Sequence, residues 1–107
     1  RCKKIFRLER NSCKDLKMLK ALEELIDVIR SRKESPVKES YTKKLLNDKK
    51  LIVEKVKEEI MELIDAIEKN TNKVHEAADI LYHLMVLLEA NDIAIEDVMN
   101  ELKKRQK

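Results

Sequence analysis

Four carboxylates stand in two pairs with the same spacing. Glu59 and Glu62 are three residues apart, and so are Glu76 and Asp79. Residues three apart share one side of an α-helix, so each pair can direct its oxygens to one place. If the pairs face each other, any two of these charges that lie 4 Å apart repel each other by roughly 4 kcal/mol at an effective dielectric of 20. A divalent cation would relieve this repulsion, and oxygen ligands select Mg²⁺, with Mn²⁺ as a second choice.

Ordinary explanations exist for the first pair, which could be solvated or bound to Lys55 and Lys69. The second pair lies on a segment that is apolar in nearly every direction, and this pattern predicts a buried helix. Ionised carboxylates are almost never buried without partners, so basic side chains or a metal must neutralise them. Glu58 points further toward water and is the weaker candidate ligand.

A basic run stands just before the carboxylates. Alone it is typical of a solvated surface, but beside a metal cleft it could grip phosphates. Its members are Lys43, Lys44, Lys49, Lys50 and Lys55. His83 and Tyr82 lie on the apolar segment, where such residues are more often hydrogen-bonded core residues than catalysts. His83 is kept as a candidate substrate-binding residue.

Helices must position these residues, and the apolar spacing together with helix caps predicts four to five of them. Asn70 to Asn72 form a turn, where Asn replaces the usual Gly, and Asn72 could cap the next helix. Ser40 is expected to cap the short helix, and Ser12 or Asn11 the first one. The fold class is therefore all-α, a bundle of four to five helices, with helices at about 12–33, 41–46, 49–68, 73–89 and 95–104.

Composition excludes several classes of protein. The 107 residues are 43% hydrophobic and 42% charged, with no Gly and one Pro. Without Gly there is no glycine-rich phosphate loop, and an all-β fold is very improbable. Cys2 and Cys13 fit no metal spacing. No stretch is long and apolar enough for a membrane span or a secretory signal, so we expect a cytoplasmic protein without a membrane partner.

Charge is divided along the chain. Residues 1–57 carry 18 basic and 9 acidic residues, and residues 58–107 carry 6 basic and 12 acidic ones. A basic half suits a phosphorylated ligand and an acidic half suits a metal ion, although a mixed surface charge would also account for the counts. We expect no nucleic-acid partner, because the basic residues lack interleaved aromatic residues.

Several segments together carry a family resemblance. The chain resembles the phosphoribosyl-ATP pyrophosphatase family of the all-α, MazG-type nucleotide pyrophosphohydrolases, over about Leu19 to Arg105. The Ser-Tyr-Thr segment at 40–42 and the Ala-Ala-Asp-x-x-Tyr-His run at 77–83 are the most specific parts. The Glu-Glu-x-x-Glu pattern, followed by Glu-x-x-Asp, is the superfamily's. The matching segments are 22–29, 39–46, 54–63, 76–84 and 95–102.

The resemblance implies an activity and a site. The activity is hydrolysis of phosphoribosyl-ATP to phosphoribosyl-AMP and pyrophosphate, the second step of histidine biosynthesis, by a stand-alone form without a fused cyclohydrolase domain. It also implies a homodimer or higher homo-oligomer. The implied Mg²⁺ ligands and catalytic residues are Glu59, Glu62, Glu76 and Asp79, with Glu58 possible. Ser40, Tyr41 and Thr42 would lie near the substrate, and Lys43, Lys50 and Lys55 would stabilise developing charge.

Departures and alternatives accompany this interpretation. Lys57 stands where the family usually has Gly, and Ala94 where a capping Ser is common. Residues 1–18 are interpreted as an N-terminal extension and 19–107 as one domain. One alternative is a MazG-type hydrolase of other nucleoside triphosphates, and another is a non-catalytic helical adaptor that dimerises.

Overall fold

A computed structural model describes residues 12–35 and 40–106, with side chains described from Leu19 onward. These residues form five helices and no strand, so the predicted all-α fold is confirmed. Each predicted boundary lies within one residue of the observed one. Asn11 lies outside the described residues, and so do Pro36 and its neighbours 37–39. The helices are α2 (Ser12–Glu34), α3 (Tyr41–Leu46), α4 (Lys49–Lys69), α5 (Lys73–Ala90) and α6 (Ile95–Arg105).

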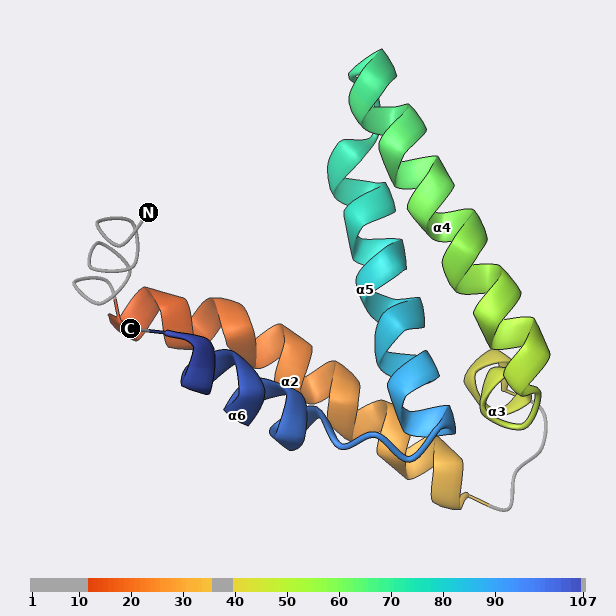
Figure 1. The fold of residues 1–107 in the computed structure, drawn as a ribbon, viewed down its shortest axis with the longest axis vertical. Coiled ribbons are helices and arrows are strands. Elements are labelled where there is room, and N and C mark those ends of the chain that lie inside the picture. The colour runs from red at the N-terminus through yellow and green to blue at the C-terminus, as the bar shows by residue number, and fades with distance from the viewer. Residues whose placement is uncertain (1–11, 36–39, 107) are drawn as a thin grey trace.

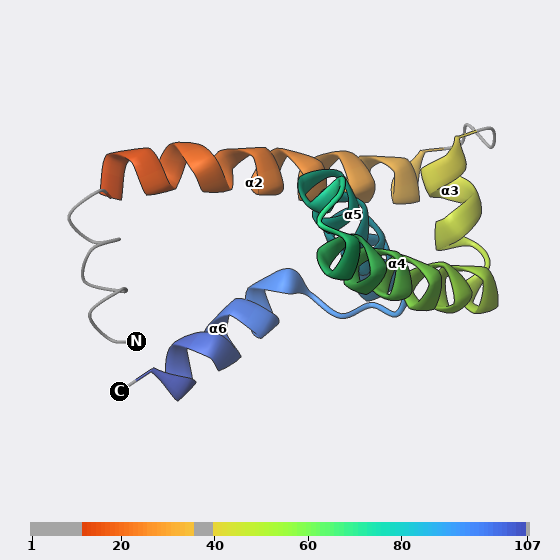
Figure 2. The same cartoon turned by 90° about the horizontal axis from the view of Figure 1, so that it is seen from above.

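Helices α4 and α5 form an antiparallel hairpin, and α2 passes across the end of the hairpin near α3 (Figure 1). Seen from above, α2 and α6 extend as separate arms to the same side of the hairpin (Figure 2). The contact between α4 and α5 is the most extensive one between helices. The hairpin is therefore the frame that positions whatever lies between α4 and α5.

The core sits where α2, α3, α4 and α5 meet. Each of these helices contributes one fully buried large side chain: Ile29, Leu45, Ile52 and Val86. Burying such a side chain stabilises the folded state by about 1.5–3 kcal/mol. The turn of the hairpin lies at the opposite end, away from this core (Figure 1).

Local hydrogen bonds fix where helices begin and end. Ser40 Oγ accepts from the Lys43 amide at 2.9 Å, as predicted, and Asp48 Oδ1 caps α4 in the same way at 3.1 Å from Leu51 N. Asn70 ends α4 in the left-handed region, at φ 56°. The predicted cap by Asn72 is wrong: it is also left-handed, at φ 47°, and its side chain makes no cap bond. An N-cap side chain reaches the helix from an extended backbone, which Asn72 does not adopt.

A cluster of ion pairs ties α2 to α5 and α6, and we call it the α2 salt-bridge cluster. Arg30 donates to Glu89 at 3.0 Å and, through both terminal nitrogens, to Glu96 at 2.9 and 2.7 Å. Lys33 donates to the Glu89 carbonyl at 2.8 Å and to Asp92 at 2.7 Å. Each cation thus joins α2 to residues that lie far away in the sequence.

Much of the hairpin's apolar surface is uncovered in one chain. Leu81 and Val74 of α5 are 47% and 85% exposed. The prediction that α5 is buried all round is therefore wrong for a single chain. Among the described helices, α5 packs mainly against α4, α3 and α2, and these leave part of it uncovered. Three isoleucines of α4 are also exposed: Ile60, Ile64 and Ile67.

The helices differ from membrane spans. Within residues 12–35 and 40–106, none is both long enough and apolar enough to cross a bilayer.

Candidate active and metal site

The hairpin brings the two predicted carboxylate pairs together. Glu59 and Glu62 lie on α4, and Glu76 and Asp79 lie on α5 just beyond the turn. The charges of Glu62, Glu76 and Asp79 all act on the Glu59 carboxyl. The charges of Glu62 and Asp79 also act on the Glu76 carboxyl. The four residues therefore form one group across the two helices, which we call the carboxylate cluster.

Ligand atoms are close enough within each helix to share an ion. One oxygen from each of Glu58, Glu59 and Glu62 lies within 4.8 Å of the others. On α5, one ligand atom from each of His75, Glu76 and Asp79 meets the same limit. Each helix of the hairpin therefore carries its own set of donors.

Lysines on α4 bind other carboxylates. Lys55 lies 3.5 Å from Glu58, and Lys69 lies 3.3 Å from Asp65. Within residues 19–35 and 40–106, no Lys or Arg forms an ion pair with Glu59, Glu62 or Glu76. The first pair is therefore not neutralised by Lys55 and Lys69. Glu62 is exposed to solvent, as the other ordinary explanation expects, whereas Glu59 is buried.

Two carboxylate oxygens are buried without a partner. Glu59 is only 8% exposed, and its Oε1 accepts no hydrogen bond from any residue that the structure describes. The Oε1 of Glu76 is buried and unpartnered in the same way. Such oxygens are rare in folded proteins, because an unsatisfied buried acceptor costs about 1–3 kcal/mol and a charged one costs more.

The environment raises the pKa of both residues. For Glu59 the main cause is burial, followed by the negative charge of Glu62, while His83 opposes the increase. Burial also raises the pKa of Glu76, and Glu62 and Asp79 add to it. Burial and like charges both disfavour the ionised carboxylate. A cation in the cluster would instead favour the ionised carboxylates and so lower both pKa values. Carboxylate oxygens are the donors that a hard divalent ion prefers.

Other predicted residues lie beside the cluster in a hydrogen-bonded network. His83, 7% exposed, donates from Nδ1 to the Asp79 carbonyl at 2.8 Å, since a carbonyl can only accept. In the neutral ring Nε2 then accepts from the Tyr41 hydroxyl at 3.0 Å. Thr42 Oγ1 and the Tyr82 hydroxyl share a hydrogen bond. The network joins α3 to the backbone of a cluster residue and leaves His83 with no free ring nitrogen.

Lysines of the predicted phosphate grip have different positions. Lys55 lies near Glu58, whose charge raises the lysine's pKa, and near Tyr41. Lys43 Nζ instead donates to the carbonyl oxygen of Lys33 at 2.8 Å, at the end of α2, and Lys50 is exposed on α4. Only Lys55 is thus placed beside the carboxylates, and substrate binding by the other two stays a prediction.

One residue of the site was missed by sequence analysis. His75 Nε2 lies 3.3 Å from Asp79 Oδ2, at the edge of the cluster. The signal was present, because His75 precedes Asp79 by four residues and thus shares its helix face. The search for oxygen ligands passed over it.

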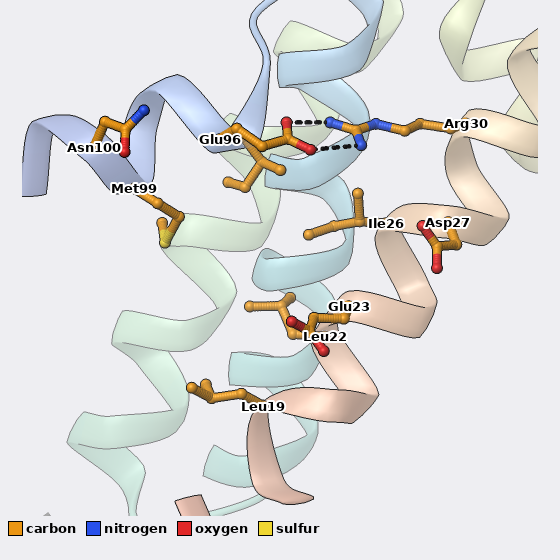
Figure 3. Close-up of a pocket in the computed structure, with 10 residues that line it drawn as sticks. Leu19, Leu22, Glu23, Ile26, Asp27, Arg30, Glu96, Met99 and Asn100 are labelled. Atoms are coloured by element: carbon orange, nitrogen blue, oxygen red, sulfur yellow. Dashed lines mark hydrogen bonds and ion pairs between the residues drawn. The ribbon is translucent and has the colours of Figure 1, made fainter. Parts of the chain in front are cut away.

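A separate groove of about 530 Å³ lies between α2 and α6 (Figure 3). Leu22, Ile26 and Met99 contribute to its apolar lining, and the Arg30–Glu96 ion pair closes one side. None of the carboxylates of the cluster lines it. The groove and the carboxylate cluster are therefore separate features of the molecule.

Fold and site together define an all-α protein with a carboxylate cluster on a helical hairpin. A family model described as phosphoribosyl-ATP pyrophosphohydrolase matches residues 22–106. The chain belongs to this family, and the resemblance predicted from the sequence is confirmed.

The names of similar proteins agree with this family membership. A phosphoribosyl-ATP pyrophosphatase of Methanococcoides burtonii is 42% identical over 93 residues, covering 82% of this chain and 94% of the relative. One of Clostridium novyi is 45% identical over 92 residues, covering 80% and 81%. A histidine biosynthesis bifunctional protein of Pyrococcus furiosus is 48% identical over 90 residues, covering 83% of this chain. The chain spans only 43% of the length of that bifunctional relative.

Proposed function

We propose that this protein hydrolyses phosphoribosyl-ATP to phosphoribosyl-AMP and pyrophosphate, the second step of histidine biosynthesis, at the carboxylate cluster. Family membership and the names of the relatives support the substrate. The observation that carries the site is the pair of buried oxygens on Glu59 and Glu76 that have no partner among the described residues, because such oxygens call for an explanation and a bound cation supplies one.

Mg²⁺ is the ion that we assign to the cluster, with Mn²⁺ as a second choice. Glu59, Glu62, Glu76 and Asp79 would hold it, and Glu58 is available if Lys55 releases it. When bound, such an ion neutralises phosphate charge and lowers the pKa of a bound water. The carboxylates on two helices hold their oxygens in place, so little reorganisation is needed when the substrate arrives.

Residues around the cluster have supporting roles in this proposal. Lys55, close to both Glu58 and Tyr41, is the cation best placed to meet a phosphate beside the carboxylates. The Tyr41 side chain is about half exposed, and its hydroxyl is fixed by His83. We therefore assign Tyr41 to the substrate side and His83 to positioning, because both ring nitrogens of His83 are already engaged.

A homodimer is the assembly that we propose for the active form. The exposed isoleucines of α4, together with Leu81 and Val74, leave an apolar surface along the hairpin. Contiguous exposed apolar surface of this kind marks an interaction site. Sedimentation or light scattering of the purified protein would test this assembly directly.

The function is tested by measuring pyrophosphate release from three substrates, with Mg²⁺ and with a chelator. We expect release from phosphoribosyl-ATP in the presence of Mg²⁺ only, with much slower release from ATP and dUTP. Preference for ATP or dUTP would instead indicate a MazG-type hydrolase of other nucleoside triphosphates. Absence of release from all three, with the protein folded, would contradict an enzymatic role and favour the helical adaptor.

A further inference from the structure

His75 adds a nitrogen donor to the edge of an otherwise all-oxygen cluster. Its Nε2 is 3.3 Å from Asp79 Oδ2, and one ligand atom from each of His75, Glu76 and Asp79 lies within 4.8 Å of the others. We propose that His75 is a ligand of the divalent ion held by the cluster, so that the site takes transition metals such as Mn²⁺ with a nitrogen ligand that Mg²⁺ does not need. This inference rests on the proposed function, which places a metal there.

The geometry suits chelation by one turn of α5. Two adjacent ligands that each lie about 2.1 Å from an octahedral ion are about 3 Å apart. The observed separation of 3.3 Å between Nε2 and Oδ2 is close to that value. His75 is 71% exposed, so its ring can turn toward an ion without breaking any packing. Imidazole nitrogen is a good ligand for transition metals, whereas Mg²⁺ prefers oxygen.

A separate observation points to an ion in this cluster. Glu59, which comes from the other helix, is nine-tenths buried, and its Oε1 has no hydrogen-bond partner. The charges of Glu76 and Asp79 act on the Glu59 carboxyl across the hairpin, so the α5 donors lie near it. The need for a cation thus comes from a buried residue of α4, independently of the exposed donors on α5.

The competing explanation is a simple surface pair. His and Asp four residues apart on a helix attract each other without any metal, and such pairs are worth little. In that case His75 would not touch a bound ion. The two explanations differ in one observable, which is whether a histidine nitrogen is bonded directly to the metal.

The sequence makes it possible to say which histidine supplies a nitrogen bonded to the metal. The sequence contains two histidines, His75 and His83. Both ring nitrogens of His83 are engaged, one with the Asp79 carbonyl and one with Tyr41. Any imidazole bonded to the ion must therefore belong to His75.

The experiment uses the full chain labelled with ¹⁵N-histidine and titrated with Mn²⁺. Pulsed electron paramagnetic resonance should detect a ¹⁵N nucleus bonded directly to Mn²⁺, and this coupling should be lost in His75→Gln. We expect the Mn²⁺ affinity of that variant to fall by about tenfold or more, by analogy with the loss of groups that support metal ligands. Mg²⁺ affinity should fall less. Lys73→Gln is the matched control, because Lys73 lies on the same turn and contacts Asn70; it should keep the coupling.

Three outcomes would overturn the proposal: Mn²⁺ bound without ¹⁵N coupling, coupling that persists in His75→Gln, or no Mn²⁺ binding at all. Failure of the proposed function is recognised separately, as absence of Mg²⁺-dependent pyrophosphate release from phosphoribosyl-ATP by the unmodified protein. An active enzyme without ¹⁵N coupling would thus refute the role of His75 alone.

Discussion

The two regions of α5 treat charge in opposite ways. Near its end, in the α2 salt-bridge cluster, the half-buried Arg30 is shared by Glu89 and Glu96. Near its start, in the carboxylate cluster, Glu59 and Glu76 keep buried oxygens with no partner. Paired charges can hold helices together, whereas unpaired buried charges only cost stability. The first region therefore serves the fold, whereas the second gives the fold no such benefit.

The pKa shifts follow the same division. Hydrogen bonds from Arg30 lower the pKa of Glu96 to about 2, because they favour its ionised form. Burial and neighbouring carboxylates raise the pKa of Glu59 and Glu76. Carboxylates whose pKa is shifted by burial and by neighbouring charges are typical of functional sites.

Replacing Glu76 by Gln should have the largest effect on activity. We expect pyrophosphate release to fall by about 100-fold or more, a loss of about 2.7 kcal/mol in transition-state stabilisation. Without metal the variant should unfold at the same or a higher urea concentration, because a poorly neutralised charge is removed. Glu68→Gln is the control, since Glu68 is exposed on α4. Normal activity in Glu76→Gln would show that the cluster is not the site.

Adding Mg²⁺ should stabilise the protein through the carboxylate cluster alone. An ion at 100 times its dissociation constant adds about 2.7 kcal/mol to the free energy of unfolding. A gain of 1 kcal/mol raises Tm by about 4–8 °C in a domain of this size. Differential scanning fluorimetry should find this rise in the unmodified protein and in Arg30→Ala, but not in Glu59→Gln. An equal rise in all three proteins would mean that Mg²⁺ binds elsewhere.

Removing Arg30 should weaken the other region. Arg30→Ala leaves Glu89, whose side chain is 13% exposed, without its cation. We expect a loss of roughly 1–2 kcal/mol in the free energy of unfolding, measured in urea, after allowing for solvent around the pair. Arg32→Ala is the matched control, because Arg32 is an exposed arginine of the same turn and should change stability by less than about 0.5 kcal/mol. Equal losses in the two variants would contradict a specific role for the cluster around Arg30.

Replacing Tyr41 by Phe tests the network that joins α3 to the site. The variant keeps the ring but removes the donor to the buried Nε2 of His83. We expect a loss of about 1 kcal/mol in the free energy of unfolding, the usual net value of one hydrogen bond. Urea titration would measure this loss. No change in Tyr41→Phe would mean that water replaces the hydroxyl.

Periodicity and cap chemistry were enough to predict the helices. Apolar residues recur every three or four positions on α4, and Ser40 supplies an N-cap, so local rules placed the boundaries within one residue. The same rules wrongly predicted a cap by Asn72, because its left-handed backbone depends on how the two hairpin helices meet.

The site was only partly predictable for a related reason. Equal spacing allowed the two carboxylate pairs to face each other, and the charges of the other three carboxylates act on Glu59 across the hairpin. Which lysine would pair with which carboxylate depends on side-chain positions, so the choice of Glu58 by Lys55 and the use of Lys43 at the end of α2 could not be read from the chain. Their roles toward substrate stay predictions.

The smallest expected effect is a difference in pH dependence between the two regions. Glu96 has a folded pKa of about 2 against 4.5 when unperturbed, so its pairing stabilises the fold above pH 4.5 and is lost as the pH falls toward 2. Glu59 is shifted the other way. Its folded state favours the protonated form, so the carboxylate destabilises the fold at neutral pH, and this penalty disappears as the pH falls through the raised pKa toward 4.5.

Urea unfolding between pH 2 and 7 without divalent ions separates the contributions of Glu96 and Glu59 to the free energy of unfolding. Relative to Glu96→Gln, the unmodified protein should be more stable at pH 7, and this advantage should vanish near pH 2. Relative to Glu59→Gln it should be less stable at pH 7, and the deficit should shrink as the pH falls. Differences of the same sign in both comparisons would contradict the division between paired and unpaired charge, because only opposite shifts give opposite slopes.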